Sequence, residues 1–136
     1  MTHHEFAPDP KRPGRNRYVG SWTEPEPEAI CLPFTEEKLK QLLALGSDPT
    51  SSTYTHQQIA HWCDRLRFQS LDDPLLRGRT IVIDVAEDVS AQWDLTIANT
   101  FSLAERRTLD YSSFRLPSDW FSDWLRRFDS SATDGG

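Results

Sequence analysis

The residue types that could do chemistry are most concentrated between positions 54 and 64, at the start of a predicted helix. This group holds two imidazoles, a thiol, a phenol and a carboxylate: Tyr54, His56, His61, Cys63 and Asp64. A histidine here is a candidate general acid or base, and a cysteine a candidate nucleophile. Since each helical residue turns the chain by about 100°, His61 lies almost opposite Ile59, Cys63 faces the buried side and His56 lies near its edge.

Residues two positions apart on a helix point away from each other, so His61 and Cys63 do not form a nucleophile and base pair by themselves. The pattern therefore favours a packed Cys63 beside a solvated His61. The alternative is a small enzyme that uses His61 or His56 as an acid or base, with or without Cys63. It predicts a pocket in which a histidine faces a second titratable group.

The same histidines belong to a candidate zinc set that also includes Cys63 and Cys31. Structural zinc sites use closely paired ligands such as C-x-x-C or H-x(3–5)-H. His56 and His61 have four residues between them, but no C-x-x-C accompanies them. Their rings would also lie roughly 140° apart around a helix. We therefore expect no metal, and the lack of a Gly-rich phosphate loop or a G-x-S-x-G motif predicts no cofactor.

Acidic residues are concentrated between positions 84 and 94. The chain has 136 residues, with 21 Asp and Glu against 15 Lys and Arg, and a net charge of −6. A patch of carboxylates either discourages edge-to-edge pairing of a sheet or docks a basic protein surface. The second interpretation gives our function hypothesis, a non-catalytic acidic binding protein, similar to immunity proteins and adaptors in size and charge only. The predicted partner-binding residues are Asp84, Glu87, Asp88 and Asp94.

Charge also bears on nucleic acid as a partner. The isoelectric point near 5.1 argues against sequence-independent binding of DNA or RNA, which relies on Lys and Arg to neutralise phosphates. A basic run nevertheless lies in the N-terminal segment: Lys11, Arg12, Arg15 and Arg17. We interpret it as a solubilising arm. Nucleic-acid binding through this arm is the alternative, and deletion of residues 1–17 would then abolish the binding.

Two helices are predicted in the first half of the chain. The first begins after Thr35, an N-cap type of residue, carries a leucine stripe and ends at Gly46. The second begins after Thr55, and its buried stripe has the i, i+3, i+4, i+7 spacing of one helix face: Ile59, Trp62, Cys63 and Leu66. Between them, residues 47–53 have turn-forming composition.

The pattern then changes to one typical of strands. The segment from Thr80 to Val85 is rich in β-branched residues, and apolar residues alternate with polar ones from Trp93 to Phe101. We predict that these segments pair as an antiparallel hairpin closed by residues 86–92. In that hairpin Asp84 and Asp94 lie near one another on polar faces.

A third strand is predicted over residues 111–116. The competing signal is Ser102 with Glu105 three positions later, which resembles a capping box and predicts a short helix over residues 103–109. We favour the third strand and leave the helix open.

The last predicted helix follows Pro117, with Ser118 as its cap. Its wide apolar face is rich in aromatic rings, and we expect this face to pack on the sheet. The residues of that face are Trp120, Phe121, Trp124, Leu125 and Phe128.

Together these elements predict a single α+β domain over residues 29–129, with a small antiparallel sheet of two or three strands packed against an N-terminal helical pair and a C-terminal aromatic-rich helix. Residues 1–28 hold five prolines and are predicted to be an extended or mobile arm, and residues 130–136 a disordered tail. The sequence contains no recognisable secretory signal or membrane-spanning stretch, and the two cysteines are expected to be reduced. We therefore expect a cytoplasmic protein.

Overall fold

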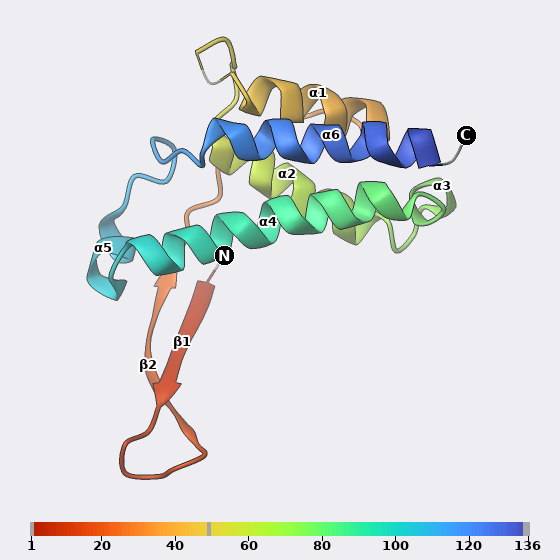
Figure 1. Ribbon diagram of the computed structural model, residues 1–136. Coiled ribbons are helices and arrows are strands. Elements are labelled where there is room, and N and C mark those ends of the chain that lie inside the picture. The colour runs from red at the N-terminus through yellow and green to blue at the C-terminus, as the bar shows by residue number, and fades with distance from the viewer. Residues whose placement is uncertain (1, 49, 135–136) are drawn as a thin grey trace.

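A computed structural model describes the backbone of residues 2–48 and 50–134, with side chains up to residue 129. A β-hairpin precedes a group of helices (Figure 1). The strands are β1 (Thr2–Pro8) and β2 (Asn16–Thr23). The helices are α1 (Glu36–Gly46), α2 (His56–Gln69), α3 (Pro74–Arg77), α4 (Thr80–Thr100), α5 (Leu103–Thr108) and α6 (Ser118–Asp134). The predicted α+β class, with a small antiparallel sheet and an aromatic-rich C-terminal helix, is confirmed.

The two helices predicted in the first half begin where their caps indicate. The hydroxyl of Thr35 accepts a hydrogen bond from the backbone N–H of Lys38 at 3.2 Å, which satisfies a free donor in the first turn of α1. Thr55 and Gln58 form a reciprocal capping box at the start of α2. The predicted apolar stripes of both helices are buried in the core.

The predicted hairpin over residues 80–101 is wrong, because this segment forms the continuous helix α4. Its buried residues recur with helical spacing: Val82, Val85, Ala86, Val89, Trp93 and Ile97. Leu95, which the alternating pattern would have placed inside a sheet, is 53% exposed. β-branched residues lower helix propensity by only a few tenths of a kcal/mol each, roughly, and burial of the stripe outweighs this. Residues 86–92 also contain no Gly or Pro to stop a helix.

The third predicted strand is also wrong, and the competing capping box is present. Ser102 and Glu105 cap each other at the start of α5, through Oγ of Ser102 and Oε1 of Glu105. Residues 111–116 form turns and extended chain instead of a strand. Tyr111 is anchored there by its hydroxyl, which donates to the backbone carbonyl of Arg106 at 2.7 Å.

The sheet lies in the segment predicted as an arm. β1 and β2 pair antiparallel, with His3 opposite Trp22 and a register shift between Glu5 and Phe6. Pro8 ends β1, and the other two prolines of this region lie in the connecting loop, so none removes a donor from the middle of the ladder. In that loop Gly14 adopts a φ of 82°, which a residue without a side chain adopts readily.

The helices build the core, and the hairpin lies at its side. α2 packs along α4, and α1 packs along α6 (Figure 1). A Cβ added at Gly46 would lie 2.2 Å from the ring of Phe121, so the backbone of α1 approaches α6 closely at this point. The aromatic face of α6 thus packs on α1 and α4. The prediction that this face packs on the sheet is wrong. The hairpin packs instead on α5.

The C-terminal segment is helical up to Asp134, so the predicted disordered tail, 130–136, begins inside α6, and its last two residues lie outside the described part of the chain. Among the described residues, no helix combines the length and apolar character needed to cross a membrane.

Candidate functional site

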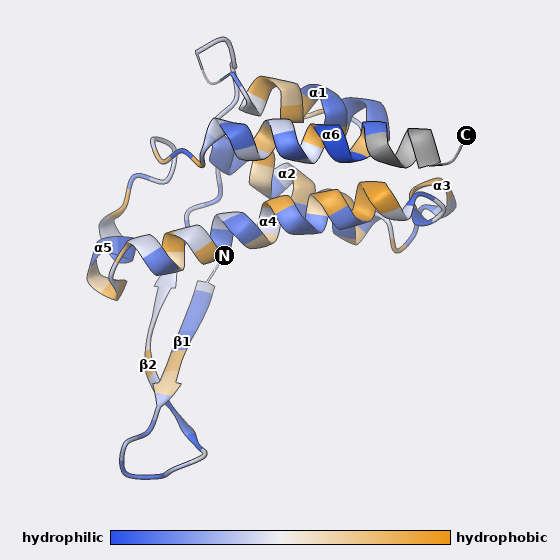
Figure 2. Ribbon diagram, viewed as in Figure 1, coloured by the Kyte–Doolittle hydropathy of each residue, from blue (hydrophilic) through white to orange (hydrophobic). Residues whose placement is uncertain are grey.

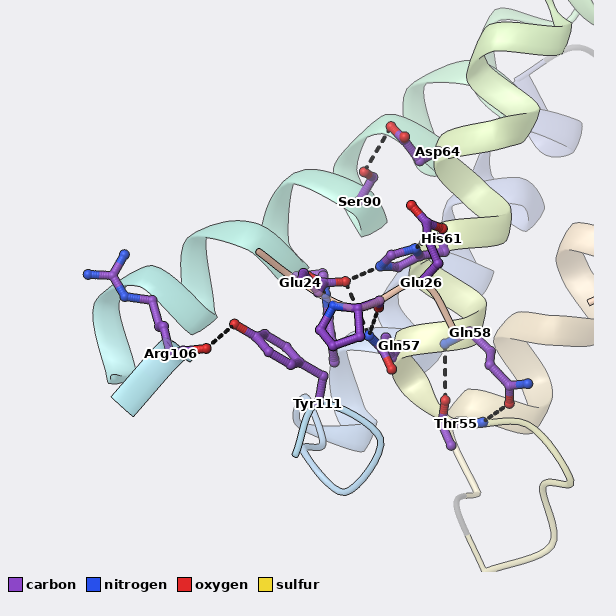
Figure 3. Close-up of polar contacts among 12 residues, drawn as sticks. Glu24, Glu26, Thr55, Gln57, Gln58, His61, Asp64, Ser90, Arg106 and Tyr111 are labelled. Atoms are coloured by element: carbon purple, nitrogen blue, oxygen red, sulfur yellow. Dashed lines mark hydrogen bonds and ion pairs between the residues drawn. The ribbon is translucent and has the colours of Figure 1, made fainter. Parts of the chain in front are cut away.

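A buried carboxylate lies where the hairpin meets the helices. Glu24 directly follows β2, is 2% exposed and accepts hydrogen bonds from two helices, and Figure 3 labels its α2 partners, His61 and Gln57. From α2, the ring Nε2 of His61 pairs with its Oε2, and the side-chain amide of Gln57 donates to the same oxygen at 3.3 Å. From α4, the indole N–H of Trp93 donates to Oε1 at 3.1 Å. The Glu24 carboxylate is therefore fixed from several directions.

Glu24 and His61 form an ion pair. Burial raises the pKa of Glu24, but the hydrogen bond and charge of His61 outweigh it and hold that pKa below its ordinary value. Burial lowers the pKa of His61, and Glu24 together with Glu26 reverses this, so the pKa of His61 is raised. Nδ1 of His61 lies 3.6 Å from a carboxylate oxygen of Glu26, so both ring nitrogens face an acceptor. The charged imidazolium fits this surrounding.

A small cavity adjoins this pair. It measures about 20 Å³, enough for one water molecule or one ion. Its polar lining consists of Glu24, His61, Asp64, Ser90 and Asp94. Burial, with Glu24 and Asp64 nearby, raises the pKa of Asp94. Acidic groups are therefore crowded here, and their crowding disfavours further negative charge and favours a cation.

His3 of β1 approaches Glu24 and Asp94 from the hairpin. Ligand atoms of His3, Glu24 and Asp94 all lie within 4.8 Å of one another. The His3 ring stacks on Trp22, with ring centroids 4.7 Å apart and an interplanar angle of 18°. His3, Glu24 and Asp94 thus bring together side chains from β1, from the end of β2 and from α4.

The other predicted histidine, His56, is a core residue. It is 1% exposed, its Nε2 lies 3.0 Å from the carbonyl of Gly46, and its Nδ1 accepts from the backbone N–H of Leu116 at 3.0 Å. This places the proton on Nε2 and leaves the ring neutral. Burial is the main cause that lowers the pKa of His56 to about 4. Both nitrogens are engaged in joining α2 to α1 and to the segment before α6.

Cys63 lies in the core with no exposed surface, and burial raises the pKa of its thiol well above the ordinary value. The candidate catalytic residues thus lie in three surroundings: Cys63 in the core, His56 against Gly46, and His61 against Glu24. His61, which the sequence placed in solvent, is partly buried, with 12% of its side chain exposed. Cys31, from the predicted zinc set, is exposed.

The predicted acidic residues lie along α4 and not at a hairpin tip. Asp88 accepts from the indole N–H of Trp124 at 2.7 Å and from Arg127 at 3.0 Å, so it ties α4 to α6. Asp84 and Glu87 are exposed, and Asp94 reaches the cavity described above. The set is therefore divided between structural and surface positions.

A groove runs between α2 and α4, and we call it the acidic groove. Its volume is about 480 Å³, and the residues that line it are Asp64, Arg67, Phe68, Glu87, Ser90, Ala91 and Asp94. Phe68 is 56% exposed in this groove. Arg67 pairs with Asp64 at 2.9 Å, so the lining carries more carboxylates than cations.

Two residues of the site, Glu24 and His3, were not among the sequence candidates. Both lie in the segment interpreted as an arm, and their partners lie far away along the chain. In the sequence, Glu24 stands out only because it belongs to a run in which glutamates alternate with prolines. That pattern does not distinguish a buried carboxylate from a solvated one. No protein-family model, curated protein or solved structure matches this chain.

Proposed function

We propose that the protein binds a basic segment of another protein in the acidic groove between α2 and α4. The observation that supports this most is the combination of exposed carboxylates with an exposed aromatic ring in one groove of about 480 Å³. Pockets for small ligands measure roughly 300–1,000 Å³, so the groove has room for side chains of a partner. The proposal keeps the acidic partner-binding role and moves it from a hairpin to a helix pair.

The chemistry of the groove suits an Arg or Lys side chain that follows an apolar residue. Glu87 and Asp94 lie along one wall and Phe68 along the other. Among the residues that the structure describes, no cation pairs with Glu87. The charged head of a partner side chain would meet the carboxylates, and its aliphatic stem would lie on Phe68 and Ala91. Such pairing sets association rate and specificity more than affinity.

A second, shallower hollow extends the acidic surface along α4. It measures about 340 Å³ and is lined by Asp84, Glu87, Asp88, Ala91 and Arg127. Asp88 is held by Trp124 and Arg127, so its removal would disturb the fold as well as the surface. Asp84 and Glu87 are therefore the residues to change.

The test uses a synthetic amphipathic peptide of Lys and Leu, with a Glu-for-Lys version as the charge control. Reversal of charge in the double variant Asp84→Lys/Glu87→Lys should weaken binding by roughly tenfold, and the effect should shrink at high salt. Asp72→Lys reverses one carboxylate, half the charge change of the double variant, in an exposed loop outside the groove and should leave the affinity within about twofold. Amide chemical shifts should change at Phe68 and Ala91.

Equal binding by the double variant and the Asp72→Lys variant would refute the proposal. Shift changes confined to another face would refute it as well. Phe68→Ala separates the apolar from the electrostatic part of the binding. It should weaken binding of the Leu-containing peptide and leave the salt dependence of binding unchanged.

The hairpin supports a second candidate, contact with single-stranded nucleic acid. Its tip is hydrophilic and points away from the helices (Figure 2), and the basic run begins there. Phe6 and Tyr18 are 59% and 57% exposed, and their rings meet edge to face at 5.7 Å. Exposed rings beside cations are the elements of a stacking surface for bases. Salt-sensitive binding of a fluorescent oligonucleotide that Tyr18→Ala weakens would support this candidate, and an affinity unaffected by salt would exclude it.

A further inference from the structure

We propose that His3, Glu24 and Asp94 bind a divalent transition-metal ion, of which Zn²⁺ is the representative probe, and that the ion fastens the β-hairpin to α4. The sequence-based expectation of no metal considered a different set, namely His56, His61, Cys63 and Cys31. That set is spread between the core and the surface. The new site uses none of its members as ligands.

The first argument is geometric. One nitrogen and two carboxylate oxygens from three segments lie within 4.8 Å of one another. Around a zinc ion with bonds of about 2.0–2.2 Å, ligand atoms are roughly 3.3 Å apart. The difference is covered by rotation of two partly exposed side chains, His3 and Asp94, while Glu24 stays in place.

The second argument is the support around Glu24. Metal-binding carboxylates are usually held by hydrogen bonds from neighbouring groups, which fix their orientation. Glu24 is held by His61 and Gln57 on one oxygen and by Trp93 on the other. On the other side, stacking on Trp22 fixes the plane of the His3 ring. Glu24 is thus already oriented without an ion, and the stacked His3 ring is held close to it.

The third argument is space and charge. The cavity of about 20 Å³ shares Glu24 and Asp94 with the ligand set, and it has the size of one water molecule or ion. Asp64 adds a further carboxylate to its wall. An ion in this position would leave room for water at its remaining coordination position, as three-ligand zinc sites do.

The ligand set also selects the class of ion. Ca²⁺ takes six to eight oxygen ligands, and Mg²⁺ keeps most of its water. Imidazole nitrogen favours zinc and its transition-metal neighbours, with affinities that generally follow the Irving–Williams order. We therefore expect Zn²⁺ to bind more tightly than Mn²⁺, and Ca²⁺ or Mg²⁺ to bind weakest.

The consequence for the fold is a metal-dependent attachment of the hairpin. Without an ion, the hairpin is joined to α5 by the Glu5–Arg106 pair at 2.9 Å and by the Arg106 guanidinium 4.2 Å over the Trp22 ring, and Glu24 joins the end of β2 to α4 through Trp93. The ion would add a link from β1 to α4. The site shares Asp94 with the acidic groove, but His3 lies outside the groove, so His3→Ala tests the metal site independently of the proposed function.

The experiment uses the full chain without an affinity tag, titrated with Zn²⁺ in a calorimeter, with the melting temperature as a second measurement. The wild type should bind a single ion, and an ion concentration 100 times the dissociation constant should raise the melting temperature by about 5–10 °C. His3→Ala and Asp94→Asn should each weaken binding by at least roughly tenfold. His4→Ala is the matched control, because His4 is the exposed neighbour on the same strand, and it should bind as the wild type does.

Three results would overturn the proposal. The first is no Zn²⁺ binding by the full chain, and the second is equal loss of binding in His3→Ala and His4→Ala. The third is loss of binding in Cys31→Ser, which would assign the ion to the exposed thiol. Circular dichroism of each variant shows that it is folded, and His3 is only partly buried, so its truncation spares the core.

Discussion

Protonation of His56 should destabilise the fold as the pH falls from 7 to 5. The neutral ring donates from Nε2 to the carbonyl of Gly46 and accepts at Nδ1 from Leu116. A second proton would have to bind at Nδ1, where it would face the backbone N–H of Leu116 and find no hydrogen-bond acceptor. Burial is the first cause that lowers the pKa of His56, and the charge of Arg115 adds to it, against the hydrogen bond to Gly46.

The size of the effect follows from the two states. The pKa of His56 is about 4 in the folded protein, against an ordinary value of 6.5. The unfolded chain therefore takes up the proton more readily. The contribution of neutral His56 to the free energy of unfolding is fully present above pH 6.5. Its loss amounts to about 2 kcal/mol between pH 7 and pH 5 and reaches a total of about 3 kcal/mol below pH 4.

The assay is urea unfolding of the wild type and His56→Gln across this range, with the free energy of unfolding extrapolated to water. Gln retains an amide donor and acceptor but does not titrate, so the loss between pH 7 and pH 5 should be about 2 kcal/mol smaller in the variant. Groups with the opposite tendency, such as His61 with its raised pKa, cancel in this comparison. Identical pH dependence in both proteins, or an NMR titration of His56 near pH 6.5, would refute the reasoning.

The remaining predictions concern packing, a buried polar link and thiol reactivity. Gly46→Ala should lower the free energy of unfolding by about 1–3 kcal/mol, because the new Cβ would meet the Phe121 ring at 2.2 Å; an unchanged urea midpoint would contradict this. Asp88→Ala should cost about 1–3 kcal/mol, since it leaves a partly buried indole N–H without its acceptor. Glu87→Ala, one position away on the exposed side, should stay within about 0.5 kcal/mol in the same thermal unfolding experiment. The native chain should react with a single equivalent of thiol reagent and the denatured chain with two, because one cysteine is exposed and the other buried; a second fast equivalent in the native state would contradict the buried position.

Local signals predicted the helices with strong caps. Thr35 and Thr55 cap α1 and α2 as expected, and the apolar stripes behind them are buried. These features act within a few residues, so a single sequence displays them fully. The capping box of Ser102 and Glu105 is an equally local signal and is present at the start of α5, whereas residues 111–116 form no strand.

In the segment 80–100, the helical spacing of the buried residues outweighs the strand propensity of individual residues. Its β-branched start and the alternation after Trp93 favoured strands, but the spacing from Val82 to Ile97 fits one helix face over the whole length. Intrinsic propensity is a weak effect, and a long apolar face packed on α2 overrides it. The position of the sheet was missed for the complementary reason, since prolines in a hairpin loop resemble prolines in an extended arm.

The sequence by itself determined the caps, the burial of Cys63, the excess of acidic residues and the aromatic face of α6, because these depend on neighbours a few positions away or on composition. Only the tertiary structure decided which charges meet. Glu24 and His61 are separated by 37 positions, and His3 lies in β1 while Asp94 lies in α4, beyond three other helices. Such pairs form because packing of the hairpin against the helices removes water from around them, and no local pattern encodes where that packing brings the chain together.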